Sequence, residues 1–254
     1  MRTRLLCLAI ILVFGAIRLP IEMRLEKEQR ALHYHGAKFS LSMRQQLSQL
    51  GFVAALSGFR AVVASVLELQ AYTAWQRVEW GRLKLLYDTV CALQPRNLQA
   101  WDMAAWHMAY NASVAAREDD TQPRAALRLK AEREYFKLGE NFMLRGIENN
   151  PDRAFLFERL ATIYRDKFED HEKAAHYYDE ASKRPDAMHY VHRFAVYELA
   201  KVPGREREAY ERLKALYLKG KDERLPTLLR LLGEMEQKLN VPPSERLYTP
   251  PTQK

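Results

Sequence analysis

The chain has 254 residues, of which 48% are hydrophobic and 28% are charged, so one or two folded domains are expected and a disordered chain is excluded. Its two cysteines, Cys7 and Cys91, are too few for a disulfide framework or a four-cysteine zinc site. The formal net charge is +8, but residues 1–67 contain nine Lys/Arg against three Asp/Glu, and the remaining 187 residues contain 31 against 29. A nucleic-acid-binding domain would need a basic face on its folded body, so we expect no nucleic-acid partner.

The N-terminus carries the pattern of an export signal. Arg2 and Arg4 precede thirteen uncharged residues, LLCLAIILVFGAI, which are followed by Arg18. Thirteen helical residues span about 20 Å, less than the ~30 Å hydrocarbon core of a bilayer, but residues 5–21 suffice if the flanking arginines reach the headgroups. We interpret residues 1–21 as an uncleaved signal anchor, with a cleaved signal peptide and a buried soluble helix as alternatives.

This anchor predicts where the protein is located. Residues 5–21 would contact the lipid bilayer as a single pass through the bacterial inner membrane, with the folded body on the extracytoplasmic side. No acidic residue occurs between Gln29 and Leu67, whereas Arg30, Lys38, Arg44 and Arg60 are basic. Anionic lipid headgroups would attract such a stretch.

Two segments separate the anchor from the main body. Residues 22–49 are mostly polar and are predicted to form a partly helical stalk. The stretch from Leu50 to Val66 is apolar but contains Arg60 near its centre. A central charge is costly in a membrane, so we expect the first helix of the body here, with a re-entrant membrane segment as the alternative.

From residue 50 onward the chain shows helical periodicity. Apolar residues recur at positions i, i+3, i+4 and i+7, as in Phe157, Leu160, Ala161 and Tyr164. Prolines stand between such runs, and Pro151 and Pro185 are 34 residues apart. A fixed period of this size is typical of stacked helical hairpins. A second unit of the same kind, ending at Pro151, would contain an insertion around residues 118–130.

The third unit carries a family resemblance. Its second helix, DHEKAAHYYDEASKRPD (residues 170–186), resembles that of a tetratricopeptide repeat (TPR). Three further units fit the TPR pattern less closely. The residues at their packing positions, small or large as the pattern requires, are Leu67, Ala71, Ala74, Leu83, Tyr87 and Val90 in the first unit; Trp101, Ala104, Ala105, Met108, Gly139, Met143 and Gly146 in the second; and Tyr190, Phe194, Tyr197, Ala209, Leu213 and Leu216 in the fourth. The whole chain looks like bacterial membrane-anchored proteins of this superfamily.

The resemblance implies an all-α fold. We expect residues 50–240 to form a right-handed solenoid of about four degenerate TPR-like hairpins, preceded by the anchor helix. A capping helix between Leu225 and Leu239 would close the stack, and residues 241–254 would form a flexible tail.

Four tryptophans within 32 residues indicate a candidate binding surface. By the family's pattern Trp101 is a packing position, whereas the first-helix face that lines the groove carries Glu68, Tyr72, Trp75, Asp102, Trp106, Glu158 and Arg165. Such a groove could hold a peptide or a helix of another protein. The alternative is that these aromatic residues extend the core.

No catalytic motif, cofactor motif or metal site is apparent. The spacing of His189 and His192 is compatible with metal binding, but no third ligand is positioned beside them, and we expect neither a metal nor a cofactor. The acidic run Glu118–Asp120 is expected in a solvated loop, and Cys91 is expected to be a buried packing thiol. Asn111-Ala-Ser113 matches a glycosylation sequon, which we attribute to chance.

We therefore expect a membrane-anchored scaffold or assembly factor that binds another membrane or envelope protein in its groove. The alternative is an enzyme on an α-superhelical scaffold that acts on an envelope polymer. It would use Glu68 or Glu158 as the acidic group and would require a strongly perturbed environment there.

Overall fold

The computed structural model of the protein describes residues 58–248, and throughout this range the regular structure is helical, with no strand. The all-α prediction is therefore confirmed. The chain divides into two compact units, with the boundary after Pro151. The predicted anchor, the stalk and the end of the tail lie outside the described residues. Within residues 58–248, no helix is both long enough and apolar enough to cross a membrane.

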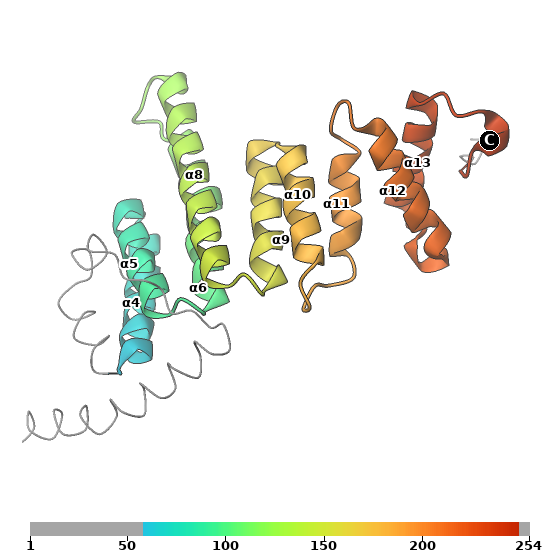
Figure 1. Cartoon of the computed structure of the whole chain (residues 1–254). Helices are drawn as coiled ribbons and strands as arrows, with labels where there is room; N and C mark the ends of the chain where they lie inside the picture. The colour runs from blue at the N-terminus through green and yellow to red at the C-terminus, as the bar shows by residue number, and fades with distance from the viewer. Residues whose placement is uncertain (1–57, 249–254) are drawn as a thin grey trace, which may run out of the picture. The chain divides into compact units, whose positions relative to one another are not determined.

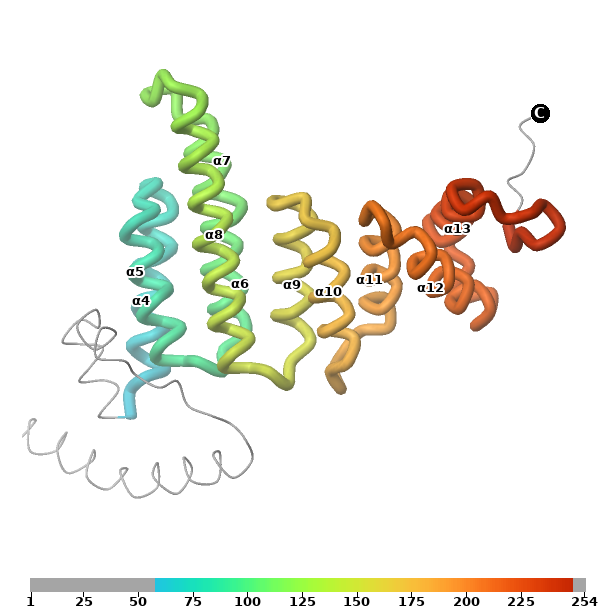
Figure 2. Tube along the Cα trace, turned by 45° about the horizontal axis from the view of Figure 1, so that its top comes forward, coloured from blue at the N-terminus to red at the C-terminus, as the bar shows by residue number. Residues whose placement is uncertain are grey.

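Unit 1, described from Gly58 to Pro151, consists of paired helices. Its elements are α4 (Arg60–Gln76), α5 (Trp80–Leu93), α6 (Leu98–Trp106), the π-helix η1 (His107–Ala112), α7 (Ser113–Arg117) and α8 (Ala125–Asn149). The first pair is α4 and α5, while α6, η1 and α7 form one continuous rod that packs against α8 (Figures 1 and 2). The two helices of each pair thus bury their apolar faces against each other.

Unit 2, described from Asp152 to Tyr248, continues with shorter helices. Its elements are α9 (Ala154–Ile163), the π-helix η2 (Tyr164–Phe168), α10 (His171–Ser182), α11 (Val191–Leu199), α12 (Glu206–Lys219), η3 (Lys221–Glu223), α13 (Pro226–Lys238) and η4 (Pro243–Glu245). Figure 1 shows α9, α10 and α11 side by side, and α12 pairs with α13. The predicted capping helix corresponds to α13, whose Leu228, Leu232 and Met235 are fully buried.

Small residues allow the helices of unit 1 to approach closely. Ala71, Ala74 and Ala105 are fully buried. A Cβ atom built on Gly139 in α8 would lie 2.7 Å from the Cβ of Ala109 and 3.0 Å from the carbonyl oxygen of Ala105. These distances are shorter than normal contacts, so only glycine fits at position 139.

The repeat period reappears in the contacts of unit 2. Three ion pairs join residues 33 apart in sequence: Arg153 with Asp186, Glu172 with Arg205, and Asp179 with Arg212. Asp186 also accepts a hydrogen bond from the Ala154 backbone N–H at 2.8 Å and so satisfies a free donor at the start of α9. All three pairs therefore connect the α9–α10 hairpin to the following segment, from Asp186 through α11 and α12, over nearly one repeat length of sequence, as expected for a helical-repeat-like fold.

The insertion predicted around residues 118–130 lengthens two helices. Residues 113–117 form α7, and α8 begins at Ala125, so only residues 118–124 form the loop. The loop is exposed and is shaped by Asp119, whose carboxylate accepts hydrogen bonds from the backbone and the hydroxyl of Thr121. Figure 2 shows α7 beside the upper part of α8. The extra residues thus extend the second hairpin along its own axis.

The first part of the predicted tail packs against α13. Glu236 is fully buried, and its Oε1 accepts a hydrogen bond from the Leu247 N–H at 2.7 Å. The Tyr248 ring lies over Gly233, where an added Cβ would come within 3.2 Å of it. Residues 241–248 therefore cover the last helix of unit 2.

We predict opposite effects for two glycine-to-alanine substitutions in unit 1. Gly139→Ala should lower the free energy of unfolding by about 1–3 kcal/mol, because its methyl group would overlap Ala109. Gly81→Ala lies in exposed helical backbone of α5 with no atom within 4 Å of the new methyl group, and it should raise stability by up to about 1 kcal/mol. Urea unfolding of the two full-length variants measures both changes in stability. Equal effects of Gly139→Ala and Gly81→Ala would contradict the close approach of α8 to α6 and η1.

Candidate functional site

Five rings meet on unit 1 and form what we call the aromatic cluster: Tyr72, Trp75, Tyr87, Trp106 and His107. The His107 ring is central, with centroids 5.1 Å from Trp106, 5.7 Å from Tyr87 and 5.8 Å from Trp75. Tyr72 follows at 5.6 Å from Trp75. The rings come from α4, α5, α6 and η1, so the cluster ties both helix pairs of the unit together.

His107 is a neutral packing residue within this cluster. It is buried, and this burial lowers the pKa of its imidazole from 6.5 to about 4. Its Nδ1 lies 3.1 Å from the amide Nδ2 of Asn111. An amide nitrogen only donates, so Nδ1 is assigned as the acceptor and the ring proton resides on Nε2. The hydrogen bond fixes the orientation of the ring.

The cluster lies where an α-helix changes to a π-helix. Trp106 is the last residue of α6, and His107 is the first residue of η1. The wider π-turn is rare in proteins and is frequent at functional sites. At this junction Trp106 is 37% exposed, while His107 is buried.

The structure brings the predicted aromatic residues together. Tyr72 is 56% exposed and Trp106 is also exposed, whereas Trp75 is half-buried against His107. Burial, with the nearby charge of Glu68 as a smaller cause, raises the pKa of Tyr87 to about 12. Asp102 is buried.

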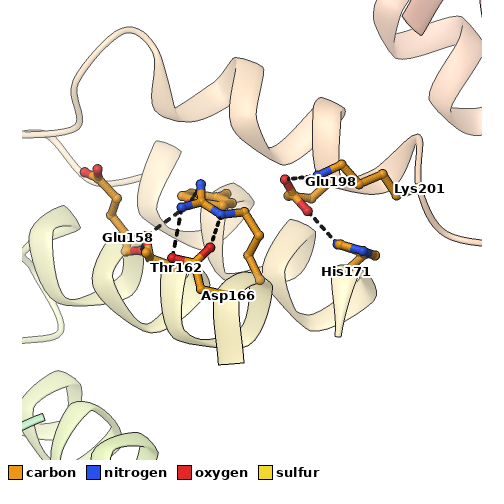
Figure 3. Close-up of polar contacts among 8 residues, drawn as sticks. Glu158, Thr162, Asp166, His171, Glu198 and Lys201 are labelled. Atoms are coloured by element: carbon orange, nitrogen blue, oxygen red, sulfur yellow. Dashed lines mark hydrogen bonds and ion pairs between the residues drawn. The ribbon is translucent and has the colours of Figure 1, made fainter. Parts of the chain in front are cut away.

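The remaining two predicted residues, Glu158 in α9 and Arg165 in η2, lie in unit 2, and Figure 3 shows Glu158 on the same rod as Asp166. Arg165 in η2 donates from Nε to the Asp166 carboxylate at 2.6 Å and from Nη1 to the Tyr178 hydroxyl at 3.1 Å. The hydrogen bond with Asp166 raises the pKa of the Arg165 guanidinium. The Glu158 carboxylate accepts a hydrogen bond from the Tyr190 hydroxyl at 2.8 Å. Both predicted residues are therefore held by neighbouring side chains.

A buried carboxylate next to this group was not anticipated. Glu198 in α11 accepts a hydrogen bond from Lys201 Nζ at 2.8 Å and pairs with His171 Nδ1 at 2.7 Å (Figure 3). The two partners offset the cost of burying its charge. His171 is 27 residues away in sequence, so no local pattern could have indicated the pair.

Unit 2 also contains an open recess of about 450 Å³ beside α10 and α12. Its wall includes the ion pairs of Arg205 with Glu172 and of Arg212 with Asp179, together with the exposed His176. These charges already neutralise one another. Among the described residues, no three His, Cys, Asp or Glu side chains are grouped as a metal ion would require.

Sequence reasoning identified three rings of the aromatic cluster as surface candidates but missed its centre. His107 occupies a helix position that faces the core, and a lone histidine gives no pattern of its own. Tyr87 was assigned correctly to the core, where it is buried. Cys91 is fully buried, and burial raises the pKa of its thiol, as expected for a packing residue.

No protein-family profile matches the chain, and no curated protein matches it. The chemistry of the site therefore rests on its own geometry. The exposed Trp106 ring packs on the neutral His107 imidazole and the exposed Tyr72 ring packs on Trp75, and such rings offer apolar faces with polar edges.

We predict that His107 makes the stability of unit 1 pH-dependent. Its folded pKa of about 4 lies below the ordinary value of 6.5, so the unfolded chain takes up the proton first and stability falls as pH decreases from 6.5 to 4. Between pH 7 and pH 5 this group should contribute a loss of about 2 kcal/mol. Urea unfolding of the wild type and of His107→Gln at both pH values measures the difference.

The matched control is His176→Gln, which changes an exposed histidine on α10. The control should retain the full pH dependence of the wild type. If His107→Gln retains it as well, the buried neutral imidazole is not its source.

Proposed function

We propose that the protein is a membrane-anchored binding protein that holds a segment of another envelope protein against the aromatic cluster of unit 1. The observation that carries this proposal is the exposure of Tyr72 and Trp106 at the edge of a packed cluster of rings. Tyrosine and tryptophan are enriched among the residues that dominate binding energy at protein interfaces. Single large apolar side chains are common on protein surfaces, whereas a group of exposed rings that pack against one another indicates a binding surface.

The rigidity of the cluster supports binding. His107 contacts three of the other rings and is itself fixed by Asn111, so the exposed rings lose little conformational freedom when a partner docks. The half-buried Glu68 on α4 adds negative charge to the same unit. A partner segment with apolar side chains and a basic residue would match this surface.

The proposed architecture is a TPR-like right-handed solenoid. The 33-residue separation of the ion pairs in unit 2 and the small residues at the helix contacts are in keeping with it.

Membrane attachment through residues 5–21 is part of the same proposal. Anchoring in the bacterial inner membrane, with the helical domain on the extracytoplasmic side, would confine the protein to the plane in which its partner resides. The local concentration of the partner rises accordingly, so a modest affinity suffices for assembly.

The double variant Tyr72→Ala/Trp106→Ala should bind the partner at least about tenfold more weakly, since residues at such positions contribute 1–2 kcal/mol or more each. The measurement is in-cell photo-crosslinking from positions 72 and 106 of the tagged full-length protein, followed by mass spectrometry and by affinity measurement with the captured partner. Both side chains are exposed, so circular dichroism should show the variant folded.

The matched control is Leu85→Ala, which removes another exposed apolar side chain of unit 1, from α5. Crosslinks from position 85 should not capture the same partner, and Leu85→Ala should bind it normally. Equal weakening in the control, or an unaffected double variant, would contradict a binding role of the aromatic cluster.

A further inference from the structure

Within residues 58–248, no element packs on the face of α4 that points away from α5. This outer face consists of Val62, Ser65, Val66, Leu69, Thr73 and Gln76. Its three large apolar side chains are 43% to 70% exposed. The buried side of the helix carries Ala64, Leu67, Ala71 and Ala74, which pack against α5. Apolar residues therefore occur on both sides of α4, although only one side has a neighbour among residues 58–248.

The outer face contains no charged residue. Within the 17 residues of α4 only Arg60, at its first position, and Glu68 are charged. Glu68 is half-buried and lies one helical turn from the buried Ala64 and Ala71, so its position is not on the outer face. Other helices of unit 1 differ: the exposed positions of α8 include Lys130, Arg133, Glu134 and Lys137. An exposed helix face in water normally carries such charges, so this one is built for a different environment.

The polar groups of the outer face are satisfied within the helix. The Ser65 hydroxyl donates to the Ala61 carbonyl at 3.0 Å, and the Thr73 hydroxyl donates to the Leu69 carbonyl at 3.2 Å. Gln76 Nε2 donates to the Tyr72 hydroxyl at 3.2 Å. Hydroxyls bonded back to their own helix do not need water, as is common for serine and threonine in membrane helices.

Two kinds of occupant would fit an apolar face, and the charges distinguish them. A helix–helix seam in solution is usually specified by charged pairs on both flanks, whereas within α4 the flanks of this face carry a single charge, Glu68, one turn before Tyr72. The chain that leads into α4 lacks acidic residues from Gln29 to Leu67 and carries Arg30, Lys38, Arg44 and Arg60. Basic flanks attract anionic headgroups.

We propose that the outer face of α4 lies on the surface of an anionic lipid bilayer, with Val62, Val66 and Leu69 inserted at the boundary between headgroups and acyl chains. Apolar helix faces bind bilayers in this manner, typically to a depth of about 5–10 Å. The proposal rests on the proposed membrane anchoring, because residues 5–21 would hold α4 near the bilayer. It adds a second lipid contact, which would orient unit 1 on the membrane.

The test uses the full-length protein reconstituted into vesicles of phosphatidylcholine and phosphatidylglycerol. Cys7 is replaced by serine, Cys91 is buried and stays, and a single environment-sensitive NBD label is attached at Leu69→Cys. The matched control carries the label at Leu218→Cys, an exposed leucine of α12. Lipids with a doxyl quencher on the acyl chain report direct contact with the bilayer.

The label at position 69 should show blue-shifted emission and at least twofold quenching by the doxyl lipids, while the label at position 218 should show neither. Replacing phosphatidylglycerol by phosphatidylcholine should reduce the quenching at position 69. A second label at Val66→Cys should reproduce the result, which guards against local disturbance by one substitution.

Three results would overturn the proposal, and each identifies a different premise as wrong. An unshifted, unquenched label at position 69 in protein that floats with the vesicles would leave anchoring intact and remove the second contact. A blue shift without quenching would show that protein covers the face, either residues 1–57 or a second copy. Failure of the protein to float with vesicles would remove the anchoring on which the proposal rests.

Discussion

The close approach of α8 to the rod of α6, η1 and α7 constrains the rest of unit 1. Gly139 presents no side chain to the rod, and a methyl group there would collide with Ala109. Ala105 and Ala109 are four residues apart and so face α8 together, whereas His107 lies midway between them and points to the opposite side. This opposite side is where Trp75 and Tyr87 meet the His107 ring. A tight contact on one side of the rod thus sets the position of the aromatic cluster on the other.

A histidine suits the centre of this cluster for a physical reason. A phenylalanine ring would fill similar space but could not accept the hydrogen bond from Asn111, which lies one turn further along the same π-helix. The imidazole accepts that bond and, because burial lowers its pKa to about 4, adds no charge to an apolar site at neutral pH. The outcome is a ring with a defined orientation beneath exposed Trp106. A surface held in this manner is preorganised, and preorganisation reduces the entropy lost on binding.

Local patterns predicted the helices and most of the core, but not the features that depend on contacts between helices. The period of apolar residues placed Ala71, Leu83 and Val90 at packing positions, and all three are buried, because a helix with one apolar stripe buries that stripe against its neighbour. The π-helices were not predicted, since a single widened turn shifts the period by less than one residue. Of the insertion expected between helices at residues 118–130, residues 118–124 form the connecting loop, whereas residues 125–130 form the start of α8, which was not anticipated. Glu198 and His171 meet only through the packing of α11 on α10.

Helix α4 combines three different surfaces, and their order around its axis has a consequence for assembly. Its small residues face α5. Tyr72, the outermost ring of the aromatic cluster, follows next around the helix, and the outer face with Val66 and Leu69 follows Tyr72. A helix with its side chains is only about 10 Å in diameter, so these three surfaces lie within about 10 Å of one another. If the outer face rests on lipid, the exposed ring of Tyr72 lies just above the membrane surface. A partner segment that contacts this ring would then be one that leaves the bilayer at the same height, such as the stretch immediately following a membrane span.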